Sequence, residues 1–128
     1  MEGRDRVTPP LPAPFLYNAQ VVDWHDGDTA HIDVDLGFAH LAAAYTLDGH
    51  PQLSCRIFGI NAPELDTDAG EAALAYVQQL CPNGTLVQVV SHSWDKYGGR
   101  WDGSITLPDG RDLATLMIDS GHAVADPA

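Results

Sequence analysis

Basic side chains are scarce in this sequence. Its 128 residues contain six Lys+Arg against 18 Asp+Glu, which gives a formal net charge of −12, and Lys96 is the only lysine. The acidity is not confined to a tail, because residues 1–64 and residues 65–128 each hold three basic and nine acidic side chains. A surface of this charge repels nucleic acid at long range. The composition therefore disfavours a general charge-driven DNA or RNA binder, and any action on a polyanion must come from a locally organised site.

Cysteine and long apolar runs are also lacking. Cys55 and Cys81 are too few for a disulfide framework and form no C-x-x-C zinc pair, so both are expected to be small buried thiols. No stretch reaches the roughly 20 apolar residues of a membrane span, and prolines occur where a signal peptide needs an apolar run. We therefore expect no membrane partner and a location in the cytoplasm or the interior of a host cell. The excess of arginine over lysine suits a GC-rich genome, such as that of a bacterium or its phage.

The chain is interpreted as one domain that follows a short arm. Residues 1–16 form a proline-rich extended arm that contains T-P-P-L-P-A-P, either a plain linker or a segment that lies on a partner. Residues 17–128 are long enough for a single domain with its own core.

Alternating side chains predict a strand at residues 29–36. In this segment His31, Asp33 and Asp35 share the face opposite to the apolar side chains. We interpret this polar row as a solvated outer face, with a set of metal ligands as the alternative.

The remaining pattern predicts further strands and two helices. The connection over 37–50 has an apolar middle, and the sequence leaves open whether it is a helical turn folded onto the sheet or a contact surface for another chain. The element order β-β-β-α-β-β-α is typical of an α+β, mainly β fold, a five-stranded OB-type Greek-key barrel with two to three helices. The segments that carry this prediction are strands from residue 17 and at 29–36, 52–60, 85–90 and 101–107, with helices at 70–80 and 113–120.

Three polar stretches stand out as candidates for chemistry, because the patterns of zinc proteases, P-loops, serine hydrolases and Rossmann folds are absent. They are D-G-D-T at 26–29, R-I-F-G-I-N-A-P-E at 56–64 and D-K-Y-G-G-R at 95–100. Only four cations follow the N-terminal arm, and three of them lie in these stretches. Such clustering favours an anion-binding site, with ion pairing to the protein's own carboxylates as the competing explanation.

These three stretches, in this order and spacing, resemble the thermonuclease (staphylococcal-nuclease-like) family over roughly residues 17–123. The resemblance implies an OB barrel and a calcium-dependent nuclease that hydrolyses phosphodiester bonds of DNA and RNA. It implies calcium ligation by Asp28, Asn61 and the carbonyl of Ala62, and a general base at Glu64. It further implies a grip on the scissile phosphate by Arg56 and Arg100, with Lys96 and Tyr97 near a neighbouring phosphate.

The chemistry of these residue types agrees with the implied roles. Calcium prefers oxygen ligands and keeps waters that can be activated. Two guanidinium groups offer bidentate donors to a phosphate that gains charge under attack, and a carboxylate beside an oriented water is a workable base.

Three departures from the family pattern lead to further expectations. Asn61 stands where well-known members have aspartate, so calcium affinity should be lower without being abolished. The second glycine of Gly98-Gly99 should be absorbed by a bulge or loop, which keeps Arg100 on the site face. The family's further C-terminal helix does not follow in this sequence, so we expect a barrel that is either only marginally stable alone or covered at that end by a protein partner. These departures favour an alternative function, a non-catalytic OB module that mediates protein contacts within a larger assembly.

Overall fold

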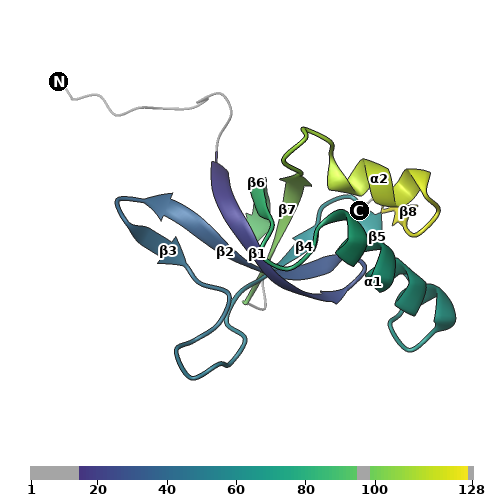
Figure 1. Ribbon diagram of the computed structural model, residues 1–128, viewed down its shortest axis with the longest axis horizontal. Helices are drawn as coiled ribbons and strands as arrows, with labels where there is room; N and C mark the ends of the chain where they lie inside the picture. Colours follow the sequence, from purple (N-terminus) through teal and green to yellow (C-terminus); the bar gives the residue numbers. More distant parts are fainter. Residues whose placement is uncertain (1–14, 95–98, 127–128) are drawn as a thin grey trace.

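The computed structural model describes residues 15–94 and 99–126 (Figure 1). Within these residues the chain forms eight strands and two helices. The strands are β1 Leu16–Asp26, β2 Thr29–Gly37, β3 His40–Ala42, β4 Ser54–Ile57, β5 Ile60–Asn61, β6 Leu86–Trp94, β7 Arg100–Thr106 and β8 Val124–Ala125. The helices are α1 Asp68–Leu80 and α2 Leu113–Asp119.

Five of these strands close into a barrel. The main sheet has the order β1-β6-β7-β4-β2-β3, and an additional pairing of β1 with β2 closes it. The β4–β7 pair is parallel and the other pairs are antiparallel. This closed mixed barrel, with α1 between its third and fourth strands, confirms the predicted OB-type fold.

Helix α1 packs closely against the turn between β1 and β2 at Gly27 and against residue 64 at Gly70. A Cβ atom added at Gly27 would lie 2.8 Å from the Cβ of Ala73, and one added at Gly70 would overlap the carbonyl oxygen of Glu64. The helix begins two residues before the predicted start because the Thr67 side chain caps it, accepting a hydrogen bond from the Gly70 amide at 3.0 Å. These contacts fix the 26–29 turn and residue 64 on one rigid frame.

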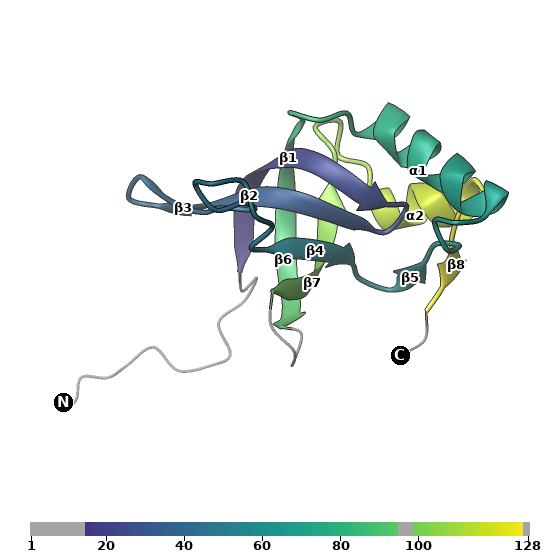
Figure 2. The same cartoon turned by 90° about the horizontal axis from the view of Figure 1, so that it is seen from below.

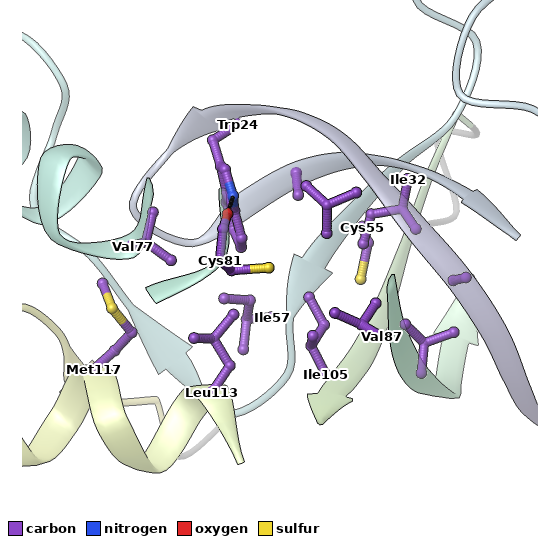
Figure 3. Close-up of a cluster of buried hydrophobic side chains, with 14 of the residues drawn as sticks. Trp24, Ile32, Cys55, Ile57, Val77, Cys81, Val87, Ile105, Leu113 and Met117 are labelled. Atoms are coloured by element: carbon purple, nitrogen blue, oxygen red, sulfur yellow. Dashed lines mark hydrogen bonds between the residues drawn. The ribbon is translucent and has the colours of Figure 1, made fainter. Parts of the chain in front are cut away.

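The barrel interior and the inner faces of both helices form one apolar core (Figure 3). Its fully buried side chains include Ile32, Ile57, Ile105, Leu113 and Met117. The indole of Trp24 is buried there and donates to the carbonyl oxygen of Cys81 at 2.9 Å, which satisfies its one polar atom.

Both cysteines are free and buried, as expected from the sequence. Burial raises the pKa of the Cys81 thiol to about 11 and raises that of Cys55 further above its ordinary value. Both therefore remain neutral core side chains at physiological pH.

Residues 37–50 do not form the helical turn considered above. They continue β2 into a two-stranded ribbon with β3 and then a loop, and the ribbon points away from the end of the barrel that carries α1 and α2 (Figures 1 and 2). Phe38 at its tip is 97% exposed and Leu41 is 63% exposed. We call residues 35–42 the ribbon.

The strand predicted over 52–60 is divided. It breaks at Phe58 and Gly59, where Gly59 adopts a φ of +86°, and Ile60 and Asn61 form β5, which pairs with β8 instead of the barrel. After this break the chain passes beside the turn between β1 and β2, where the Ala62 amide donates to Asp28. Within the described residues, no helix is long and apolar enough to span a membrane.

Candidate active site

An open pocket of about 570 Å³ lies where the turn between β1 and β2 meets β4 and the segment after β5. It is lined by six of the eight residues predicted for the site: Asp28, Arg56, Asn61, Ala62, Glu64 and Arg100. The other two, Lys96 and Tyr97, lie outside the described residues. The fold therefore brings together side chains from all three polar stretches of the sequence.

Strand register places the two arginines on the same outer face of the barrel. Arg56 lies opposite Thr29 on β2 and Asp102 on β7, and Ser54 lies opposite Arg100. Alternate residues of a strand share a face, and Ser54 precedes Arg56 by two residues. Arg100 is therefore offset from Arg56 by two residues, or about 7 Å, along the paired strands. The chain before Arg100 contains Gly99 with a φ of +77°, a backbone that glycine adopts readily.

The carboxylate of Asp28 is buried and joins two parts of the site. One oxygen accepts a hydrogen bond from the amide of Ala62 at 2.9 Å, and the other accepts from the hydroxyl of Thr29 at 3.0 Å. Its side chain is placed by the 26–29 turn, in which an oxygen of Asp26 accepts from the Asp28 amide at 3.0 Å. A buried carboxylate with these donors keeps a fixed direction.

Asp26 adds a second carboxylate beside Asp28. Burial raises its pKa above the ordinary value; the side chain and negative charge of Asp28 raise it further, while the hydrogen bond from the Asp28 amide lowers it. Crowded carboxylates of this kind disfavour a second negative charge and favour a neighbouring cation.

Arg56 is held firmly by groups of the protein. Its guanidinium donates to the carbonyl oxygen of Ile60 at 2.9 Å and to the side-chain oxygen of Asn61, and it pairs with the carboxylate of Asp126 at 3.4 Å. Asp126 is set in place by its amide, which donates to the carbonyl oxygen of Gly59 at 2.8 Å. The ion-pairing explanation weighed from the sequence thus applies to Arg56, which has an acidic partner.

Glu64 lines the pocket from the segment that follows β5. Its carbonyl oxygen accepts from the amide and the hydroxyl of Thr67, at 3.1 and 2.6 Å, while its side chain is exposed to solvent. The backbone is therefore fixed by the helix cap while the carboxylate stays open to water.

Sequence reasoning missed two participants. His31, interpreted there as part of a solvated row, also lines the pocket, whereas Asp33 instead accepts from the Ala44 amide at 2.8 Å. Asp126 carried no signal at all, since its position depends on the two-residue pairing of β8 with β5. The strand alternation identifies the face of His31, but only the register of the neighbouring strands shows what that face contains.

The donors that could hold calcium are oxygens. Among the residues that the structure describes, no three Asp, Glu, His or Cys side chains are grouped as a metal site. The predicted set has one carboxylate, from Asp28, together with an amide oxygen and a main-chain carbonyl, and the carboxylate of Asp26 lines the same pocket. This chemistry fits a weakly held calcium ion that retains several waters.

No model of a known protein family matches the chain, and no functionally curated protein matches it. The assignment of a function therefore depends on the motifs and on the geometry of the pocket.

Proposed function

We propose that this protein is a calcium-dependent nuclease that hydrolyses phosphodiester bonds of DNA or RNA. The observation that supports it most is the meeting, in one pocket, of two arginines, an exposed glutamate and a buried carboxylate from three separate segments. Residues that only stabilise a barrel have no need to share such a pocket. The proposal also explains how a protein of charge −12 acts on a polyanion, since the arginines act locally.

In the proposed mechanism Arg56 and Arg100 bind the scissile phosphate and stabilise the charge that its oxygens gain in the transition state. Glu64 takes a proton from the attacking water. Asp28, Asn61 and Ala62 would hold calcium, which supplies positive charge beside the phosphate and orients water when bound. Lys96 and Tyr97 are proposed to contact a neighbouring phosphate.

Substitution of Glu64 tests this proposal directly. With denatured DNA and calcium we expect cleavage by the wild type, its loss in chelator, and a fall of about 10²–10⁴-fold in Glu64→Gln. Glu71→Gln is the matched control, because Glu71 is an exposed glutamate in the first turn of α1 that does not line the pocket. A folded wild-type protein that leaves DNA intact in calcium would refute the nuclease assignment.

A second candidate function is a non-catalytic module for protein contacts. The ribbon favours it, because Phe38 and Leu41 expose large apolar side chains in a region that carries none of the pocket residues. The ion pair between Arg56 and Asp126 also agrees with this second function, because it engages one of the arginines proposed to bind phosphate. The cleavage experiment separates the two functions.

A further inference from the structure

Beside the pocket, three polar side chains form a hydrogen-bonded cluster that the proposed mechanism does not use. Nδ1 of His31 lies 2.6 Å from an oxygen of Asp23, and the hydroxyl of Tyr45 lies 3.0 and 2.7 Å from the two oxygens of that carboxylate. The Tyr45 hydroxyl is also 3.1 Å from Nδ1 of His31. The cluster joins β1, β2 and the loop that follows the ribbon.

The chemistry of the cluster fixes which nitrogen of His31 carries a hydrogen toward Asp23. A carboxylate only accepts, so Nδ1 donates, and Nε2 is the ring nitrogen left to face a ligand. Burial and the hydrogen bond to Asp23 raise the pKa of Tyr45 to about 12, so its hydroxyl keeps its proton and helps to hold the carboxylate in place. Asp23 and Tyr45 thus orient the imidazole.

His31 itself lines the pocket. His31 is paired with Asp23 on one side and with Ser54 of β4 on the other. Because Asp23 engages Nδ1, Nε2 is the ring nitrogen available to a ligand in the pocket that His31 lines. Among residues 15–94 and 99–126, no hydrogen bond engages Nε2.

His31 and Glu64 line the same pocket from different elements. His31 is paired with Ser54, which is paired with Arg100, and Arg56 stands two residues, or about 7 Å, further along β4. Glu64 comes from the segment after β5. An in-line displacement at a phosphate bound by Arg56 has the attacking water on one side and the leaving oxygen on the other. A base and a proton donor that reach one pocket from separate segments can serve these two sides.

We infer that His31 is a catalytic residue that donates the proton to the leaving oxygen, positioned by Asp23 and Tyr45; this inference rests on the proposed nuclease function. As the water oxygen bonds to phosphorus, Glu64 accepts a proton from the water. As the bond from phosphorus to the leaving oxygen breaks, that oxygen takes the proton of Nε2. The products are a phosphate monoester and an alcohol, and one proton returned from Glu64 to His31 through solvent restores the starting state.

The test compares natural DNA with oligonucleotides in which a sulfur replaces one bridging oxygen, at either the 3′ or the 5′ side of the linkage. A thiolate leaves without a proton, so a missing proton donor matters only for the oxygen substrate. For His31→Gln we expect a loss of about 10²–10⁴-fold on natural DNA and nearly wild-type cleavage when sulfur occupies the leaving position. Asp23→Asn should show the same pattern with a smaller loss. His50→Gln is the matched control, because His50 is an exposed loop histidine outside the pocket.

Each outcome bears on a different part of the argument. Equal loss of His31→Gln on oxygen and sulfur substrates, in a protein with wild-type thermal unfolding, would overturn the proton-donor role and leave the nuclease function intact. Wild-type cleavage of natural DNA by His31→Gln would overturn it as well. A wild-type protein that cleaves no DNA would refute the nuclease function, and the inference with it.

Discussion

Strand β2 serves two very different regions of the molecule. Its first half borders the pocket, where polar side chains such as Asp28, Thr29 and His31 are held by hydrogen bonds from other strands and from the segment after β5. Its second half enters the ribbon, where Leu36 is 49% exposed and Phe38 is 97% exposed. The pocket is assembled from distant parts of the chain, whereas the ribbon is made of neighbouring residues and packs on little else.

This difference shows which side chains are already held in place before a ligand binds. A side chain fixed by several partners loses little freedom when a ligand arrives, so its contacts contribute to catalysis. The ribbon has exposed apolar area but few fixed groups, which suits association and not chemistry. Changes in the two regions should therefore affect different measurements.

Among the changes that compare these two regions, replacing the exposed arginine of the pocket should have the largest effect. Arg100→Gln should lower cleavage by about 10²–10³-fold, because one donor to the charge of the transition state is lost. Its unfolding free energy should change by about 0.5 kcal/mol or less, as is usual for an exposed side chain. Steady-state cleavage of denatured DNA and urea unfolding measure the two quantities.

Arg111→Gln is the control for that change. Arg111 is also exposed, but it pairs with Asp109 at 2.7 Å outside the pocket. Equal activity of the Arg100 and Arg111 variants would contradict the proposal that Arg100 acts on the phosphate in the pocket.

A smaller effect should follow from removing the acid that competes for Arg56. The Arg56–Asp126 pair is 3.4 Å long and both side chains are 20% exposed, so it competes with a phosphate for the guanidinium. Asp126→Asn should bind a short oligonucleotide about three- to five-fold more tightly, which corresponds to about 1 kcal/mol. Titration calorimetry measures this affinity, and both proteins carry Glu64→Gln so that the oligonucleotide is not cleaved during the measurement.

Asp109→Asn provides the comparison for this variant, since it breaks an arginine pair that is not in the pocket. Its oligonucleotide affinity should equal that of the parent protein. If both variants gained affinity equally, the gain would come from the lower overall negative charge, and Asp126 would have no specific competition with substrate.

The sequence predicted the barrel well because the fold depends on local patterns that repeat. Alternation at residues 29–36, the apolar stripe at 70–80 and the turn residues between strands each report a local structure, and the OB arrangement is a common way to combine them. The division of the strand predicted over 52–60 could not be read, since it depends on the pairing of Ile60 with Ala125 at the other end of the chain.

The residues of the candidate site that could be predicted are those that belong to short sequence motifs. Arg56 and Glu64 belong to one continuous stretch, and Asp28 belongs to a turn of recognisable composition. The cluster of Asp23, His31 and Tyr45 was not predictable, because it depends on the register between β1 and β2 and on the path of the loop after the ribbon. A shift of one residue in that register would turn His31 toward the core.

The smallest effect should come from the tip of the ribbon, and it sharpens the contrast with the pocket. Phe38 adopts a φ of +53°, a left-handed conformation that is unfavourable for an aromatic residue and well tolerated by asparagine. Because the side chain is 97% exposed, Phe38→Asn removes no core packing, and its unfolding free energy should stay within about 0.5 kcal/mol of the wild type. Cleavage of denatured DNA should be unchanged, since Phe38 does not line the pocket. A tenfold loss of cleavage with normal unfolding would show that the ribbon contacts the nucleic acid, and the separation between a catalytic half and an associative half of β2 would then be wrong.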